Sequence, residues 1–301
     1  MHNRLLRWFK RYGRHDLPWR KTSDPYKIYL SEIMLQQTQV ERVKDYFERF
    51  LKRFPTLKSL AEADEEEVLA LWSGLGYYVR ARNLRKTATF TGGVLPKSYE
   101  ELIKLPGIGD YTASAICSFA YDQPLPVIDT NIKRVLSRYF ATTKGLKKLA
   151  TSLLHPIHPR QHNLALMDLG ALICTPTSAK CQSCPLQPTC QGKGDPLAFS
   201  APKKRGTEKL ELFLGLCIQD GKIALLPSTE KLYQGLLVLP HIDPIEEHYI
   251  ATIRHSYTKY RIQAHLYTCE APKEAIWIDL EAIDQAPVSN LTKKALRCLH
   301  P

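Results

Sequence analysis

Apolar side chains recur at three- and four-residue steps through most of the first 190 residues, which is the spacing of one face of an α-helix. Across 26–54 the apolar positions with this period are Ile28, Ile33, Leu35, Val40, Val43, Phe47 and Phe50. The segment from Asp64 to Trp72 begins acidic and ends apolar, which suits the dipole at a helix N-terminus. We therefore expect residues 1–190 to be nearly all helix, with breaks where glycines and prolines gather, at 74–76, 105–109 and 124–126.

The pattern changes beyond Cys190. Residues 191–208 hold glycines, prolines and a basic run, and we expect them to form a linker. From about Lys209 the apolar period shifts towards two, which predicts a strand at Leu210–Ile218 and, after a hairpin turn, its partner at Ile223–Leu226. Further strands are expected at 236–239, 260–267 and 275–278, with a closing helix at 290–298. Residues 209–301 should therefore form a small α+β domain.

The formal charge of +12 favours a polyanionic partner such as nucleic acid, although a well-solvated basic surface is the plain alternative. A chain of 301 residues more readily builds two cores than one. No apolar run approaches the length that crosses a bilayer, and the start, His2–Arg11, is too charged for a secretory signal. We expect a cytoplasmic protein, associated with the nucleoid in a bacterium, or a nuclear protein if the cell has a nucleus, with no membrane partner.

Four cysteines, Cys174, Cys181, Cys184 and Cys190, are separated by six, two and five residues. Thiolates are soft ligands that suit an iron–sulfur cluster or a zinc ion. Structural zinc sites usually pair two short Cys-x-x-Cys hairpins across a longer gap, whereas only Cys181 and Cys184 form such a pair here. Eight cysteines in all are few for a secreted disulfide scaffold. The spacing predicts a metal site and favours a [4Fe–4S] cluster over zinc.

Gly107 and Gly109 lie in the turn Leu105–Asp110, directly before a small-residue helix expected at 111–120. Such glycines allow a tight turn and bring amide N–H groups close to an anion at a helix N-terminus. A simple helix–helix turn is the alternative, because Gly-x-Gly alone has low specificity. Followed by a helix rich in Ala and Ser, the turn is typical of a helix-hairpin-helix, and the natural anion for a basic protein is a DNA phosphate.

Two carboxylates occupy positions that can carry chemistry. Glu32 lies in the apolar stretch Ile28–Leu35, and an inward side chain would have the raised pKa of a general acid, whereas an outward one would be an ordinary surface residue. Asp129 opens the helix expected at 130–136, where an N-cap is its plain role. An acid and an ionised carboxylate are also the pair that cleaves a glycosidic bond. The residue pattern alone does not bring these two together.

Motifs in order along the chain resemble the MutY-type adenine DNA glycosylases, members of the helix-hairpin-helix superfamily that contains endonuclease III. The resemblance covers almost the whole length and rests on Leu17–Arg20, Ser31–Val40, Leu71–Tyr78, the hairpin, the Asp129 segment, Met167–Gly170 and the cysteine loop. It implies a mainly α helix-hairpin-helix glycosylase region with an iron–sulfur loop at 1–190, the linker 191–208, and a small α+β Nudix-like domain at 209–301. Within the first region it implies a six-helix subdomain at about 22–125 and an iron–sulfur subdomain at 1–21 plus 126–190.

The resemblance implies hydrolytic removal of adenine opposite 8-oxoguanine or guanine in double-stranded DNA, after the adenine is flipped out of the stack. Glu32 matches the acid that protonates N7 of adenine, and Asp129 matches the carboxylate that stabilises the cationic sugar. Tyr111 and Asn131 match residues that support this cation and position Asp129 and water. Endonuclease III relatives carry a nucleophilic Lys in place of Tyr111, so the tyrosine implies a monofunctional enzyme without lyase activity.

Other positions match DNA and base contacts of the family. Gln37 and Tyr77 match side chains that intercalate or wedge near 8-oxoguanine. The four cysteines match the ligands of a [4Fe–4S] cluster, whose loop presents Lys180 to the DNA backbone. Stretches that line the adenine pocket contain Trp19, Arg20 and Leu35.

The C-terminal domain resembles the Nudix-like module with which these enzymes read 8-oxoguanine, although it has no Arg-Glu-x-x-Glu-Glu box. The resemblance implies a lesion-reading loop at Arg254–Tyr260, with contacts from Tyr257, Thr258 and Lys259. Relatives usually show His at the position of Lys259. A second departure is Leu164, where the family carries a Gln or Glu that hydrogen-bonds adenine.

Two other functions remain open. A bifunctional endonuclease III-like enzyme acting on oxidised pyrimidines is disfavoured by Tyr111 and by the extra C-terminal domain. A non-catalytic iron–sulfur DNA-binding protein that senses redox state has no need of Glu32 with Asp129 and Asn131, although both carboxylates also have structural explanations. We expect an enzyme, a DNA glycosylase that acts as a monomer.

Overall fold

The structure is a computed structural model that describes residues 1–199, 206–230, 232–244, 246–257, 259–284 and 286–298. The chain forms two compact units. Unit 1 comprises Met1–Ala61 and Lys86–Lys203, and unit 2 comprises Glu62–Arg85 and Lys204–Pro301. Among the described residues, no helix has the length and apolar character needed to span a bilayer.

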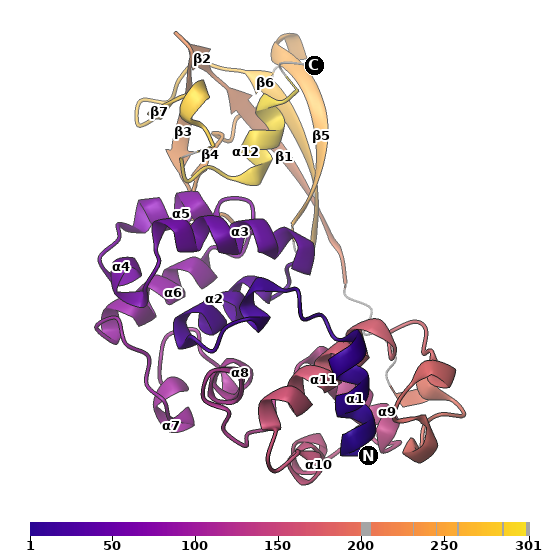
Figure 1. Cartoon of the computed structure of the whole chain (residues 1–301). Helices are drawn as coiled ribbons and strands as arrows, with labels where there is room; N and C mark the ends of the chain where they lie inside the picture. Colours follow the sequence, from indigo (N-terminus) through magenta and orange to yellow (C-terminus); the bar gives the residue numbers. More distant parts are fainter. Residues whose placement is uncertain (200–205, 231, 245, 258, 285, 299–301) are drawn as a thin grey trace. The chain divides into compact units, whose positions relative to one another are not determined.

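Unit 1 is built from helices (Figure 1), as the period of its apolar residues predicts. Its helices are α1 (His2–Tyr12), α2 (Pro25–Leu35), α3 (Val40–Arg53), α4 (Leu57–Ala61), α7 (Tyr99–Leu102), α8 (Asp110–Tyr121), α9 (Thr130–Tyr139), α10 (Leu146–Leu153) and α11 (Pro159–Leu172). The helix α5 (Glu65–Trp72) lies in unit 2, and α6 (Val79–Phe90) begins in unit 2 and ends in unit 1.

Polar side chains fix where several of these helices begin. Asp24 at α2, Ser98 at α7 and Asp129 at α9 each accept a backbone N–H from the first turn. These N–H groups have no acceptor inside the helix. The capping side chain replaces the hydrogen bond to water that they lose on burial. The caps at α7 and α9 hold the ends of the hairpin region and of the Asp129 segment.

The helix α2 is buried over most of its surface because it packs against both α3 and α8. Eight of its eleven residues are buried, which is the pattern of a central helix rather than of an amphipathic surface helix. Glu32 is one of them, with 6% of its surface exposed. The packing of α2 thus places a carboxyl group inside unit 1.

A second part of unit 1 is organised by the pairing of α9 with α11, and α1 packs on α11. Gly170 of α11 allows this close approach, because a Cβ there would lie 2.8 Å from the Cβ of Asn131 on α9. Apolar side chains of all three helices share one core, including Leu5, Val135 and Leu169. The start of α9, which carries Asp129 and Asn131, is therefore fixed against a well-packed body.

The C-terminal part of unit 2 contains two small sheets (Figure 1). In the first, β6 (Tyr260–Thr268) runs parallel to β1 (Glu208–Leu216) and antiparallel to β5 (Tyr249–Tyr257). The second is built around β3 (Lys222–Pro227), and its other strands are β2 (Ile218–Gln219), β4 (Leu237–Val238) and β7 (Ile276–Asp279). The helix α12 (Asn290–Leu296) follows the strands. A helical region plus a small sheet-containing domain is the architecture that the sequence predicts.

The expected pairing of Leu210–Ile218 with Ile223–Leu226 is confirmed only next to the turn, where Ile218 pairs with Ile223. Ile223–Leu226 does not pair with Leu210–Leu216, because β1 pairs with β6 over its whole length. The turn itself is correct, with positive φ at Asp220 and Gly221, but it specifies only the pairs next to it, those of the short strand β2 with β3. The chain changes sheets near Cys217, and no local pattern marks that change.

The expected loop at Arg254–Tyr260 is also largely strand. Arg254–Tyr257 belongs to β5, and Tyr257 pairs with Tyr260 at the start of β6. Only two residues separate the strands, and Thr258 lies outside the described residues. Ladder hydrogen bonds hold the alternating residues of this segment, so a tight hairpin replaces the predicted loop.

Candidate active site

Glu32 and Tyr111 meet inside unit 1. Tyr111, from the first turn of α8, donates its hydroxyl to Oε2 of Glu32 on α2 at 2.5 Å. Burial raises the pKa of Glu32 to about 7, and the charge of Asp129 acts in the same direction, whereas the Tyr111 hydrogen bond and the charge of Arg20 act against it. Glu32 can therefore hold a proton near neutral pH and give it to a bound group.

The carboxylate of Asp129 is held by two hydrogen bonds at the start of α9. Its Oδ1 accepts the N–H of Ile132 at 2.6 Å, and its Oδ2 accepts an amide N–H from Asn131 at 2.9 Å. Arg134 in turn donates to the amide oxygen of Asn131 at 2.8 Å and to the carbonyl of Gly170 at 2.6 Å. These contacts fix the position of the Asp129 carboxylate. Its negative charge raises the pKa of both Glu32 and Tyr111.

A cavity in unit 1 opens beside Glu32. Side chains that line it include Trp19, Arg20, Phe119 and Leu164. Leu35, the last residue of α2, is not among the lining residues. Half of the lining residues are polar or charged, since Ser31, Glu32 and Arg160 join Arg20, so the cavity offers donors and acceptors beside its aromatic and apolar wall. The structure thus places Trp19 and Arg20, but not Leu35, at the cavity.

Two polar residues at this cavity were not predicted as site residues. One lines the cavity, and the other pairs with Arg20. Arg160 lines the cavity and donates to the carbonyl of Thr22 at 2.6 Å. Asp168 is fully buried and accepts from Arg14 at 2.7 Å and from Arg20 at 3.2 Å. A clue to Asp168 was present, since a carboxylate inside an apolar helical stretch is the same pattern that singled out Glu32.

Gln37 and Tyr77 share an uncommon backbone conformation. Their φ angles are 59° and 52°, in the left-handed region that L-residues other than Gly, Asn and Asp rarely adopt. Gln37 is exposed after the end of α2 in unit 1, and Tyr77 lies in the turn between α5 and α6 in unit 2. The ring of Tyr77 lies 5.5 Å from the guanidinium carbon of Arg80.

The predicted hairpin joins α7 to α8 in unit 1. Gly107 has φ 73°, which explains the need for glycine, and Gly109 caps α8 with open space where a Cβ would stand. Asp110 is held by the hydroxyl of Tyr99 at 2.5 Å and by Lys147 at 2.9 Å. The first turn of α8 therefore faces a gap that an anion can approach through backbone N–H groups.

The predicted lesion contacts are only partly described. Tyr257 ends β5, and Thr258 lies outside the described residues. Lys259 is paired with the carboxylate of Glu208 at 2.5 Å, and its ammonium lies 5.1 Å from the centre of the Tyr260 ring. Tyr257 and Lys259 lie at the closed end of the β5–β6 hairpin in unit 2.

The four cysteines line one cavity in unit 1, and each is half-buried. Arg138 donates to Sγ of Cys174 at 3.2 Å, and burial raises the pKa of Cys184 to about 11. Among the described residues, no three His, Cys, Asp or Glu are arranged to hold a single metal ion. The donors at the cavity are thiols, with no imidazole or carboxylate, and a soft all-sulfur set of this kind suits an iron–sulfur cluster. Lys180 also lines the cavity and is exposed.

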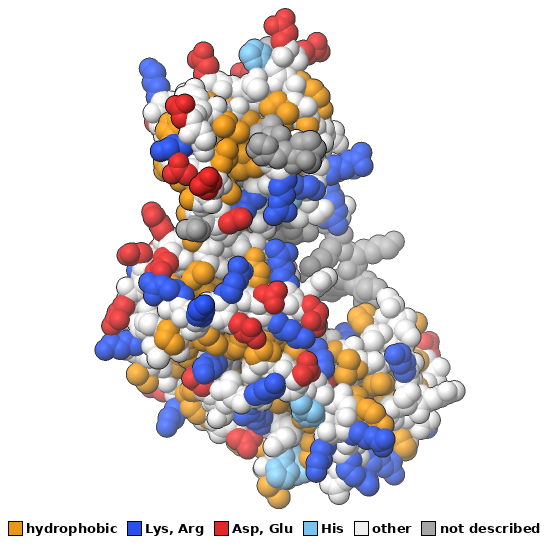
Figure 2. Space-filling view, turned by 45° about the horizontal axis from the view of Figure 1, so that its top comes forward, with side chains coloured by type: hydrophobic (Ala, Val, Ile, Leu, Met, Phe, Trp, Pro, Cys, Tyr) orange, Lys and Arg blue, Asp and Glu red, His pale blue; other side chains and the backbone are white. Residues whose placement is uncertain are grey.

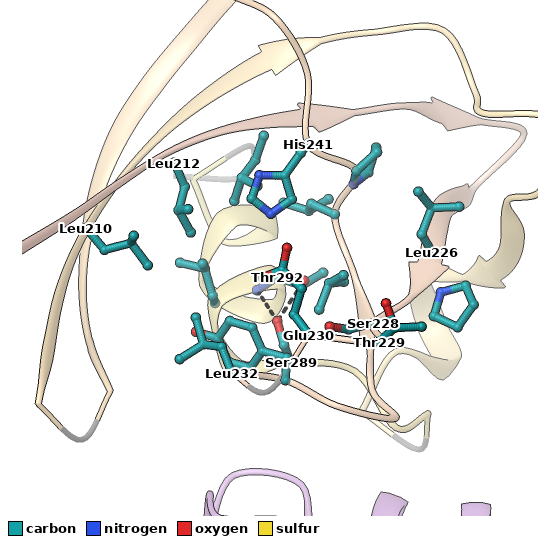
Figure 3. Close-up of a pocket in the computed structure, with 17 residues that line it drawn as sticks. Leu210, Leu212, Leu226, Ser228, Thr229, Glu230, Leu232, His241, Ser289 and Thr292 are labelled. Atoms are coloured by element: carbon teal, nitrogen blue, oxygen red, sulfur yellow. Dashed lines mark hydrogen bonds between the residues drawn. The ribbon is translucent and has the colours of Figure 1, made fainter.

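A different cavity, of about 380 Å³, lies in the C-terminal domain (Figure 3). Leucines of β1 form part of its wall, and Glu230 and His241 are exposed at it. The buried polar side chains in it, Ser289 and Thr292, are occupied with each other at the start of α12. Among the described residues that line this cavity there is no acid and carboxylate pair like that of unit 1.

The fold and the carboxylate pair define a class of protein. Residues 30–159 match the family described as HhH-GPD superfamily base excision DNA repair protein. A solved structure of a thermostable thymine-DNA glycosylase aligns with a TM-score of 0.60 at 30% identity, over 64% of this chain and 94% of that one.

Two relatives narrow the class. The chain is 37% identical over 256 residues to the adenine DNA glycosylase of Buchnera aphidicola subsp. Schizaphis graminum, covering 79% of this chain and 74% of the relative. It is 47% identical over 198 residues to that of Buchnera aphidicola subsp. Baizongia pistaciae, covering 62% of this chain and 56% of the relative. The chain belongs to the adenine DNA glycosylase family.

Proposed function

We propose that this protein removes adenine paired with 8-oxoguanine or guanine from double-stranded DNA, by hydrolysis of the N-glycosidic bond. The observation that carries the proposal is the buried Glu32, protonated near neutral pH and bonded to Tyr111, within electrostatic range of the fixed carboxylate of Asp129. An acid and an ionised carboxylate of this kind serve the two needs of glycosidic cleavage. Membership of the family supports adenine as the base.

In the proposed reaction the adenine flips into the cavity beside Glu32. Glu32 gives its proton to N7 as the bond from N9 to C1′ breaks, and the bonding electron pair leaves with the neutral base. The positive charge left on the sugar is stabilised by the carboxylate of Asp129, whose position Asn131 holds. A water then adds its oxygen to C1′ and gives a proton to the carboxylate of Glu32, which leaves an abasic site and restores the acid.

We propose that the enzyme has no lyase activity. Strand cutting by this superfamily's chemistry needs an amine that forms a Schiff base with the sugar, and the position concerned is Tyr111. Its hydroxyl donates to Glu32, and the same burial that raises the pKa of Glu32 keeps the pKa of Tyr111 well above its usual value. Tyr111 therefore stays protonated and acts as a donor, not as a nucleophile.

The thiols of Cys174, Cys181, Cys184 and Cys190 are proposed to hold a [4Fe–4S] cluster, which when bound cross-links their loop. The chain's own residues then order this loop: Arg138 bonds to Sγ of Cys174 and to the carbonyl of Thr175. We expect about four iron and four acid-labile sulfide per chain. One zinc per chain without sulfide is the result that contradicts this proposal.

Binding of duplex DNA is supported by charge and by the hairpin. Figure 2 shows Lys and Arg side chains spread over much of the visible face, with Asp and Glu among them. The total formal charge of +12 attracts a phosphate backbone, and the first turn of α8 after Gly109 offers N–H groups to it. We propose that the protein acts on this substrate as a monomer.

A single-turnover assay tests the function. The substrate is a duplex with one adenine opposite 8-oxoguanine, and strand breaks are read with and without alkali for wild type, Glu32→Gln and Asp129→Asn. Breaks that need alkali, and that fall by a factor on the order of a hundred or more in each variant, support the proposal. Breaks without alkali point to lyase chemistry, and no base release by wild type overturns the proposed function.

A further inference from the structure

A short helical segment belongs to the same compact unit as the C-terminal domain. Residues Glu62–Arg85 join Lys204–Pro301 in unit 2, although they stand more than a hundred residues earlier in the chain. This segment contains α5, the turn with Tyr77, and the start of α6.

Arg82 donates hydrogen bonds both within this segment and to the sheet domain. Its Nε donates to the Glu65 carboxylate at 2.8 Å, which joins α6 to α5, and its Nη2 donates to the carbonyl of Gln234 at 2.8 Å. Gln234 lies between β3 and β4. The Arg82 side chain is 17% exposed, so its contacts are partly shielded from water and salt. One guanidinium thus links two helices and a loop of the sheet domain.

The backbone of that loop is shaped to receive Arg82. Gly235 has φ 74°, and a Cβ built on it would lie 1.8 Å from Nη2 of Arg82. A side chain at this position would collide with the guanidinium. The glycine therefore serves both a left-handed turn and the close approach of an arginine.

Two weaker hydrogen bonds reach the turn directly. Ser73 donates its hydroxyl to the carbonyl of Val288, and the Asn290 amide donates to the carbonyl of Gly74, each at 3.4 Å. Inside the turn, the indole of Trp72 donates to the carbonyl of Gly76 at 3.2 Å. The turn is therefore attached to the sheet domain on one side and braced by its own helix on the other.

We infer that Arg82 is a positioning residue that makes the Tyr77 turn and the β5–β6 hairpin act as one unit in reading the base opposite adenine. The inference rests on the proposed function and on the family resemblance, which implies that Tyr77 wedges beside 8-oxoguanine and that the Arg254–Tyr260 segment contacts it. Two contacts on one compact unit lose less freedom on binding than two contacts on separate parts, so both can engage one nucleotide at once. Arg82 touches neither the adenine nor the sugar in this account.

The test compares Arg82→Met, which keeps the length of the side chain and removes its donors, with Arg82→Lys. The matched control is Lys86→Met, which removes an exposed cation one turn further along α6. Single-turnover rates are measured on adenine opposite 8-oxoguanine and opposite guanine. Affinities are measured for the same two duplexes carrying a non-cleavable 2′-fluoro adenosine.

The Arg82→Met variant should lose about tenfold of the preference for 8-oxoguanine over guanine, in rate and in affinity, since both hydrogen bonds of the guanidinium are lost, including the one to the sheet domain. The rate opposite guanine should change less than twofold, Arg82→Lys should recover part of the preference, and Lys86→Met should match wild type. An equal loss on both duplexes means a merely structural role and overturns the inference, as does an unchanged preference. If wild type releases no adenine, the proposed function fails, while the affinity ratio still tests Arg82.

Discussion

Tyr111 and Glu32 stand 79 residues apart in sequence and are joined by a 2.5 Å hydrogen bond between α8 and α2. The bond ties the first turn of the helix after the hairpin to the buried acid. A hydroxyl that donates to a carboxylate stabilises its ionised form, so Tyr111 holds the pKa of Glu32 below the value that burial alone would set. This contact makes the acidity of the site adjustable by one side chain.

The pH dependence of base release follows from this contact. A general acid works in its protonated form, which predominates below its pKa, so the rate should fall as the pH rises through about 7. In Tyr111→Phe the pKa of Glu32 should rise, and the fall in rate should move to higher pH. Single-turnover rates over a pH series measure both midpoints. A midpoint that stays in place or moves down contradicts the assigned role.

The contact between α9 and α11 should tolerate no side chain at Gly170. A Cβ there would lie 2.8 Å from the Cβ of Asn131 and 3.0 Å from its carbonyl oxygen. Gly170→Ala should lower the free energy of unfolding by about 1–3 kcal/mol, despite the better helix propensity of Ala.

The displaced Asn131 should also slow base release, because its amide holds Asp129. Denaturant unfolding and single-turnover rates measure the two effects. Gly194→Ala is the control, since a Cβ there meets open space. Normal stability in Gly170→Ala would show that the helices separate at little cost.

Stability should fall in mild acid because of His162. This histidine is 1% exposed, its two ring nitrogens have no hydrogen-bond partner among the described residues, and burial followed by the charges of His2 and His155 lowers its pKa to about 3. Between an unfolded pKa of 6.5 and this value, the unfolded chain binds a proton that the folded chain does not. The free energy of unfolding is therefore not reduced by His162 above about pH 6.5, and it decreases as the pH falls towards 3.

Replacing His162 should reduce this acid sensitivity. The wild type should lose about 1–2 kcal/mol more than His162→Phe does between pH 7 and pH 5. Urea unfolding at the two pH values measures it, with His241→Gln, an exposed histidine, as control. Equal pH dependence in wild type and His162→Phe would assign the acid sensitivity to other groups.

Asp168 should be the most costly carboxylate to remove. It is fully buried and is the counter-charge of Arg14 and Arg20, whose side chains are 25% and 8% exposed. Asp168→Ala leaves these cations without their partner and should cost about 3–5 kcal/mol. Asp284→Ala breaks an ion pair in which the carboxylate is 82% exposed, and should cost at most about 1 kcal/mol. Denaturant unfolding compares the two, and similar losses would contradict the buried role.

Local chemistry predicted much of the helical unit correctly. The spacing of apolar residues predicted α2, α3 and α5, and Asp129 caps α9 as its position before that helix predicts. These features depend on residues within one or two turns of each other, so their determinants are present in any short window of the sequence. The hairpin turn at Asp220 and Gly221 was predictable for the same reason.

Pairing between distant segments was not predictable in this way. The partner of β1 is β6, some fifty residues away, and an apolar strand fits several partners equally well. The assignment of Glu62–Arg85 to the same unit as the C-terminal domain depends on Arg82 meeting a carbonyl at Gln234. The role of Asp168 also required the structure, because its two arginines come from residues near the start of the chain.

The sequence by itself determined the helices, their caps, the turn glycines and the family, because these follow from local periodicity and from motifs read in order. Tertiary structure alone decided that Glu32 points inward, that Tyr111 meets it, and that Asp129 is near enough to affect its pKa. The physical reason is burial. The same Glu on a solvent-exposed helix face would be an ordinary ionised carboxylate. The packing of α2 against α3 and α8 removes the water that would stabilise its charge.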